Sequence, residues 1–237
     1  MSDALPSAPS TAHRPGPGLG PGHGPGHGPG PRRPDVTELE LVGGREHRRL
    51  HLVEHDPAWA EAFAGHRDRI VRALTESGLW GSPGVGVEHI GSTSVPGLAA
   101  KPIIDLVLTV PDITAEEDYL DPLLGAGYVL RVREPGHRLV RTPERDVHVH
   151  VYATGATEVD DYLLLRDRLR TDDEDRALYE ATKRDLLSRD WPDMNAYADA
   201  KTDVIEAIKA RARAARASGL VTNHEPERRP GPVSDQS

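Results

Sequence analysis

The residue that most suggests chemistry in this chain is an aspartate inside an apolar run. Asp105 is the one charged residue in residues 103–110, which are otherwise β-branched residues and leucine. Such a run is typical of a strand buried on both faces. A carboxylate there is costly unless it is paired, hydrogen-bonded or bound to a metal. Two roles follow for Asp105: a structural one, bonded to backbone amides of the preceding loop or to Lys101, or that of a metal ligand.

A second polar pattern lies about forty residues further along the chain. Asp146, His148 and His150 alternate with valines, and strand side chains repeat every second residue. The three polar groups are therefore predicted on one face, with the valines toward the core. Beside the strand of Asp105, one carboxylate and up to two imidazoles could converge, a ligand set that suits Mn²⁺, Zn²⁺ or Fe²⁺ better than Mg²⁺. The pattern alone favours the alternative of an antiparallel strand with a solvated polar face.

The turn that precedes the aspartate strand is rich in small residues. Residues 91–97 carry the hydroxyls of Ser92, Thr93 and Ser94 between two glycines. Backbone amides at such a turn can bind a phosphate, and hydroxyl groups add further donors. The segment is not a Walker A loop, because no Gly-Lys-Ser/Thr follows it and the next lysine is Lys101.

Helices and strands can be predicted around these residues from their periodicity. Asp56-Pro57 begins a helix that extends to about residue 77. Strands are predicted over 85–90, 103–110, 128–132, 138–141 and 146–151, and further helices over 116–124, 160–169, 173–189 and 195–217. This order predicts one α+β domain over residues 45–217. Residues 1–44 and 218–237 offer little apolar surface to bury and are predicted to be disordered tails.

Composition excludes several classes of protein. The 237 residues include no cysteine, which rules out disulfides, thiolate zinc sites and cysteine nucleophiles. The formal net charge of −9 disfavours general nucleic-acid binding, since an acidic protein repels phosphate backbones. The chain contains no apolar run of the roughly 20 residues that a membrane helix needs. We therefore expect a cytoplasmic protein without a membrane segment.

The run from Glu88 to Asp105, EHIGSTSVPGLAAKPIID, resembles the signature of the GrpB (UPF0157) family. The resemblance continues through residues 146–150 and 165–170 to the pairs Tyr179/Lys183 and Tyr197/Lys201, so it covers most of residues 48–211. It implies a nucleotidyltransferase-like fold of polymerase-β type, a mixed sheet with flanking helices. In that superfamily a Gly-Ser turn holds nucleotide phosphates and carboxylates on two strands bind two divalent ions. The second carboxylate position is Val107 here, a departure from the pattern, because valine cannot bind a metal.

The resemblance implies a ligand and a set of site residues. The expected ligand is a nucleotide or another phosphorylated small molecule, bound with one divalent ion such as Mg²⁺, Mn²⁺ or Zn²⁺. Carried over by position, the phosphate-binding turn is Gly91-Ser92 and the first metal carboxylate is Asp105. On this hypothesis the predicted metal ligands are Asp105, His148, His150 and Glu88; the predicted phosphate-binding residues are Gly91, Ser92, Thr93, Ser94, Lys101 and Arg170; and the predicted catalytic residues are Asp105, Lys183 and Lys201. The alternative for Arg170, Lys183 and Lys201 is a role in surface ion pairs, which contribute little.

Two other functions stay open at this stage. The family also occurs as the C-terminal half of some dephospho-CoA kinases, which suggests a non-catalytic module that assists the folding or stability of such a partner. A metal-dependent hydrolase of small phosphoesters is the other alternative. The sequence leaves open whether the protein is a transferase, and it identifies neither the acceptor nor the metal.

Overall fold

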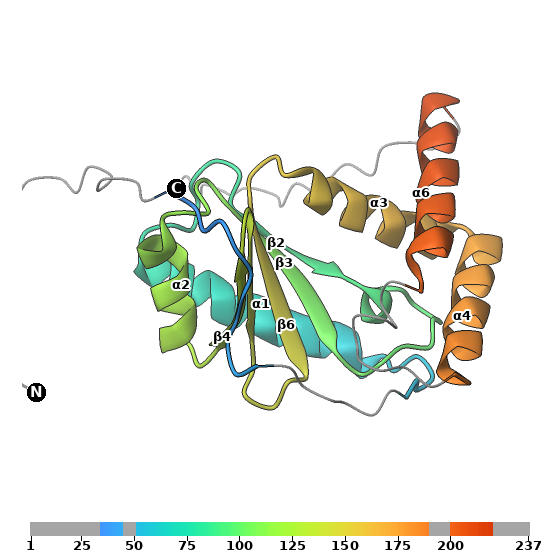
Figure 1. Cartoon of the computed structure of the whole chain (residues 1–237), viewed down its shortest axis with the longest axis horizontal. Helices are drawn as coiled ribbons and strands as arrows, with labels where there is room; N and C mark the ends of the chain where they lie inside the picture. The colour runs from blue at the N-terminus through green and yellow to red at the C-terminus, as the bar shows by residue number, and fades with distance from the viewer. Residues whose placement is uncertain (1–33, 45–50, 190–199, 220–237) are drawn as a thin grey trace, which may run out of the picture. The chain divides into compact units, whose positions relative to one another are not determined.

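The computed structural model describes residues 34–44, 51–189 and 200–219. Within these ranges, six strands form one sheet in the order β1-β4-β5-β6-β3-β2 (Figure 1). The strands β3 and β6 are parallel, and the other neighbouring pairs are antiparallel. The strands are β1 (Glu40–Leu41), β2 (Gly86–Ile90), β3 (Ile104–Val110), β4 (Val129–Glu134), β5 (His137–Arg141) and β6 (Val147–Ala153).

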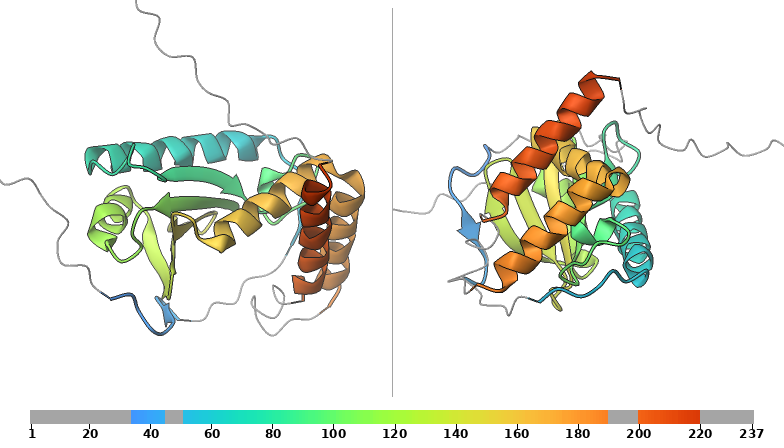
Figure 2. Two further views of the ribbon diagram at one scale, coloured as in Figure 1. Left: turned by 90° about the horizontal axis from the view of Figure 1, so that it is seen from above. Right: turned by 90° about the vertical axis from the view of Figure 1, so that its right-hand side faces the viewer.

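Helices flank this sheet on both faces, so the predicted α+β fold with a mixed sheet is confirmed. Views from two directions show α1 along one face and α3 on the other, with α4 and α6 side by side at one end (Figure 2). None of the described helices combines the length and the apolar composition that crossing a bilayer requires. The helices are α1 (Ala58–Glu76), the short 3-10 helix η1 (Ser92–Ser94), α2 (Glu116–Gly125), α3 (Thr157–Thr171), α4 (Asp173–Leu187) and α6 (Thr202–Ala217).

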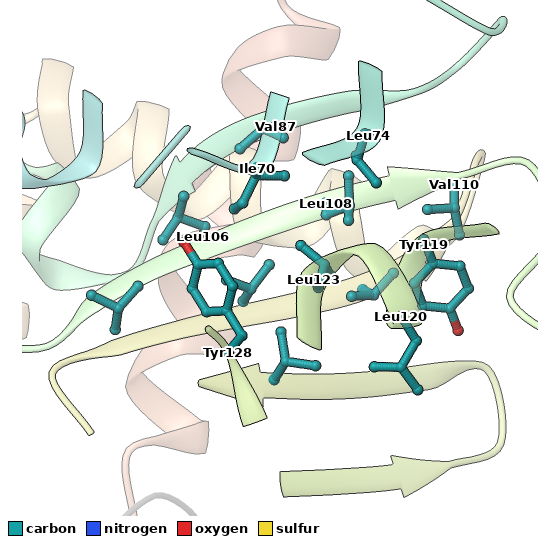
Figure 3. Packing of buried hydrophobic residues seen from close by; sticks show 14 of the residues in the cluster. Ile70, Leu74, Val87, Leu106, Leu108, Val110, Tyr119, Leu120, Leu123 and Tyr128 are labelled. Atoms are coloured by element: carbon teal, nitrogen blue, oxygen red, sulfur yellow. The ribbon is translucent and has the colours of Figure 1, made fainter. Parts of the chain in front are cut away.

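The main core lies between the sheet and the pair α1 and α2. The apolar stripe of α1 places Ile70 and Leu74 against Leu106 and Leu108 of β3, all four fully buried (Figure 3). The valines of β6 point to the same side, as their alternation predicted. This face of the sheet is therefore the structural one, and the alternate side chains of β3 and β6 point to the other face.

A second, smaller core joins the helices to the loop between β2 and β3. Val95 and Leu98 of that loop pack with Leu169 of α3, Tyr179 of α4 and Ile208 of α6. The carboxylate of Asp175 is buried and accepts hydrogen bonds from the guanidinium groups of two helices, α3 and α6. These contacts hold α4 against the turn at residues 91–97.

Part of the predicted N-terminal tail is ordered. Residues 34–44 fall within the tail predicted over 1–44, but they include β1, and Asp35 accepts a 2.6 Å hydrogen bond from the buried Arg138. The physical reason is that acidic residues of this segment pair with arginines of the sheet, although the segment has few apolar residues to bury. The remaining tail residues, 1–33 and 220–237, and the predicted helix start near residue 195 lie outside the described residues.

Candidate functional site

The parallel pairing of β3 with β6 brings a carboxylate and two imidazoles together. Asp105 lies opposite His148, and Val107 lies opposite His150, all on the face away from the main core. Asp105 Oδ1 is 3.5 Å from His148 Nδ1 and 3.8 Å from His150 Nε2. One ligand atom of each residue lies within 4.8 Å of the others, and all three side chains are partly exposed. The strands therefore form an accessible three-residue cluster of metal-binding chemistry.

These separations fit a shared ion better than direct hydrogen bonds. An N–H···O bond usually joins atoms 2.7–3.2 Å apart. Two ligand atoms about 2.1 Å from one tetrahedral ion lie about 3.4 Å apart, close to the distances observed. Burial alone would raise the pKa of Asp105, but its interactions with the neighbouring His148 and His150 outweigh that effect and hold the pKa well below its usual value. The carboxylate is thus ionised at neutral pH, as a metal ligand must be.

Gly91 provides the space in which the Asp105 carboxylate lies. Its φ angle is +71°, a conformation that favours glycine, and a Cβ built there would lie 2.6 Å from Asp105 Oδ2. The turn after β2 and the carboxylate of β3 therefore approach each other closely enough to exclude any side chain at position 91.

The position expected for a second metal carboxylate is apolar in this protein. The side chain of Val107 is 1% exposed and packs with Ile90, Tyr152 and Val159 beneath α3. A second ion would need to lie in this cluster, whose residues supply no carboxylate in place of the missing one. The described residues therefore fit one ion beside Asp105 and do not fit the paired ions of the superfamily pattern.

A buried lysine of α4 reaches the turn beside this cluster. Lys183 Nζ donates to Ser92 Oγ at 3.2 Å and to the carbonyl of Ala99, and it lies 4.8 Å from the ring centre of Tyr179. Burial raises the pKa of the neighbouring Tyr179 hydroxyl, and the interaction with Ser92 opposes that shift. Burial and the charge of Lys201 lower the pKa of Lys183 to about 7. Of the three hydroxyl groups in the turn, that of Ser92 is the one hydrogen-bonded to a side chain of α4.

Two further lysines approach the same region. Lys101, in the loop before β3, and Lys201, just before α6, both lower the pKa of Lys183 through repulsion. Burial lowers the pKa of Lys201 too, while attraction to Asp105 opposes that effect. Three lysines predicted from the sequence thus converge from three separate segments, which creates a positive field next to the carboxylate.

Other predicted phosphate-binding groups point elsewhere. The buried hydroxyls of Thr93 and Ser94 donate to the carbonyls of Ile103 and Gly91, so both are committed to backbone acceptors. Arg170 Nε donates to the carbonyl of Ser94 at 2.9 Å. The three side chains line a pocket of about 470 Å³ that also includes Ala60 and Phe63 of α1. The structure does not bring them to the metal cluster.

Two acidic side chains named from the sequence are also absent from the cluster. Glu88 Oε2 is 2.8 Å from Arg166 Nη1, and this predicted metal ligand is therefore neutralised by an arginine of α3. Asp146 lies just before β6, where its carboxylate accepts a 2.6 Å hydrogen bond from Thr142 Oγ1. The alternating strand expected from residue 146 begins at Val147, because Asp146 belongs to the turn after β5.

The sequence did not indicate that His137 of the β4–β5 hairpin contacts the cluster, or that Glu134 contacts His137. His137 Nε2 lies 3.1 Å from His150 Nδ1, and His137 Nδ1 lies 2.6 Å from Glu134 Oε1. The His137 ring also stacks on Tyr152, with ring centres 4.6 Å apart. Burial and the nearby His150 lower the pKa of His137, which favours its neutral form. Periodicity predicts the two strands of this hairpin, but it does not indicate which neighbouring strand the side chains of the hairpin contact.

The fold and the site together define a class: an α+β protein with a candidate one-ion centre and a lysine-lined turn. The GrpB protein family model matches residues 49–211 of this chain. The chain belongs to the GrpB family, as the sequence signature indicated.

Similar proteins come from several bacteria. The chain is 63% identical over 185 residues to UPF0157 protein SCO7215 of Streptomyces coelicolor, covering 78% of this chain and 96% of the relative. It is 31% identical over 181 residues to a dephospho-CoA kinase of Mycolicibacterium paratuberculosis, covering 64% of this chain and 43% of the kinase. The crystal structure of conserved protein GrpB from Enterococcus faecalis matches with a TM-score of 0.59 and 29% identity, over 70% of this chain and 99% of that one.

Proposed function

We propose that this protein binds one divalent metal ion together with a nucleotide or another phosphorylated small molecule. The observation that carries the proposal is the position of the Asp105–His148–His150 cluster beside the Ser92–Lys183 contact. The turn at residues 91–97 links the two groups, because Gly91 lies against the carboxylate of Asp105 and the adjacent Ser92 accepts a hydrogen bond from Lys183.

The residues of the site have distinct roles in this proposal. Asp105, His148 and His150 hold the ion, which supplies Lewis-acid charge to a phosphate when bound. The amides of the turn at Gly91 and Ser92 bind phosphate oxygens. Lys183 and Lys201, both held at lowered pKa by burial, supply positive charge that a bound phosphate stabilises. If a transfer reaction occurs, these ammonium groups stabilise the charge that develops on the phosphate.

The first test is metal binding, measured by isothermal titration calorimetry with Zn²⁺, Mn²⁺ and Mg²⁺. Asp105→Asn keeps the shape of the side chain and removes its charge, so we expect loss of binding. Glu88→Gln is the matched control, since it removes a carboxylate from the same face of the sheet without touching the cluster. Equal metal affinity in wild type and Asp105→Asn would refute this assignment.

The second test is ligand binding by thermal shift, with nucleoside triphosphates and coenzyme A precursors in the presence and absence of the metal. A ligand that binds the native state raises the melting temperature by mass action. We expect a metal-dependent shift that Asp105→Asn and Lys183→Met both reduce. The absence of a shift with every compound would count against a phosphorylated ligand.

A second function is favoured by the kinase similarity and by the apolar surroundings of Val107. In this alternative the domain assists a partner protein, such as a dephospho-CoA kinase, and catalyses nothing itself. It predicts that co-expression raises the yield of soluble kinase and that Asp105→Asn preserves this effect. An unchanged kinase yield would eliminate the alternative.

A further inference from the structure

The hairpin between β4 and β5 adds a carboxylate and an imidazole behind the proposed metal cluster. Glu134 ends β4 and His137 begins β5, and the two residues form the last pair of that ladder. On β5, His137 lies opposite Tyr152 of β6, which is two residues along the strand from His150 and on the same face of the sheet. Four strands therefore contribute one row of contacts, from Glu134 through His137 and His150 to Asp105.

The direction of each hydrogen bond in this row follows from its first member. A carboxylate only accepts, so Glu134 Oε1 accepts a hydrogen bond from His137 Nδ1–H. A neutral His137 then has a lone pair on Nε2, which accepts a hydrogen bond from His150 Nδ1–H. A neutral His150 in turn carries its own lone pair on Nε2, the atom that lies 3.8 Å from Asp105 Oδ1. Two lone pairs face each other there, an arrangement that a cation bound between them stabilises.

We infer that Glu134 and His137 are positioning residues that hold His150 in the Nδ1–H tautomer, with its Nε2 lone pair directed at the metal position. The inference rests on the proposed metal site for its functional meaning. A histidine that binds a metal commonly donates its other N–H to a partner that fixes its tautomer and ring orientation. Here the partner is itself a histidine, which Glu134 and the stack on Tyr152 hold in place.

Two variants at position 137 separate the hydrogen bond from simple packing. His137→Phe keeps a ring to stack on Tyr152 but removes the acceptor for His150. His137→Gln loses the ring but can present its amide oxygen to His150 Nδ1. We expect His137→Phe to weaken Zn²⁺ affinity about 10- to 100-fold and His137→Gln to recover most of that loss. Metal-free urea unfolding of each variant measures any general loss of stability separately.

The tautomer itself is measured on the metal-free full chain by long-range ¹H–¹⁵N NMR of ¹⁵N-labelled histidine at alkaline pH. The inference predicts a proton on His150 Nδ1 in the wild type and a shift toward Nε2–H in His137→Phe. An Nε2–H tautomer in the wild type would overturn it, as would unchanged Zn²⁺ affinity in His137→Phe. If the wild type shows the Nδ1–H tautomer but binds no metal, the inference holds and the proposed function fails.

Discussion

The buried Lys183 leads to a prediction about stability whose sign can be worked out. In the folded protein, burial and Lys201 lower the pKa of Lys183 from 10.5 to about 7. Between these two pH values the unfolded chain binds a proton that the folded protein lacks. The free energy of unfolding must therefore rise with pH over this range, by at most about 1.4 kcal/mol per pH unit.

The perturbation that reveals this effect is Lys183→Met, which keeps the length of the side chain and removes the titration. The variant also loses the hydrogen bonds to Ser92 and Ala99, but that loss changes little with pH. Between about pH 7.5 and 9.5, we expect the free energy of unfolding of the wild type to rise by about 2–3 kcal/mol relative to that of Lys183→Met. Urea unfolding followed by far-ultraviolet circular dichroism at several pH values measures the difference.

Lys209→Met is the matched control for this experiment. Burial opposes the charge of Lys209, but Asp161 and Glu206 outweigh it and raise its pKa above the ordinary value. That lysine stays protonated in both the folded and the unfolded state below about pH 10. The free energy of unfolding of Lys209→Met should therefore change with pH in parallel with that of the wild type. Parallel curves for Lys183→Met as well would show that Lys183 remains charged in the folded protein, and the description of the site would be wrong.

Two further substitutions test the close approach of the turn to Asp105 and the buried ion pairs of the sheet. Gly91→Ala forces a Cβ to within 2.6 Å of Asp105 Oδ2 at a positive φ, so it should cost about 1–3 kcal/mol of stability and lower metal affinity, measured by urea unfolding and calorimetry. Arg138→Ala should cost about 3–5 kcal/mol, because it removes the buried cation that Asp35 and Glu116 share. The exposed Arg184→Ala should leave the free energy of unfolding nearly unchanged in the same assay, because surface ion pairs contribute little.

Periodicity explains why much of the fold was predictable from the sequence. The unbroken apolar run of β3 and the alternation in β6 specify which side chains share a face, since that depends only on backbone geometry within one strand. The valines of β6 are accordingly buried, and both histidines point away from the core. The family signature likewise singled out the Gly-Ser turn and Asp105, which do lie together.

Partners across strands and the depth of charged groups required the tertiary structure. Local patterns do not encode that β6 pairs in parallel with β3, which is what places His148 opposite Asp105. The same patterns could not exclude Glu88, whose partner Arg166 comes from a helix more than seventy residues away.

The sequence by itself determined the faces of the strands, the small-residue turn and the family. Only the tertiary structure decided which polar groups meet: His137 behind His150, Lys183 against Ser92, and an apolar cluster around Val107. The physical reason is that the face of a side chain depends on local backbone geometry, whereas its neighbours and its pKa depend on long-range packing and on exclusion of water.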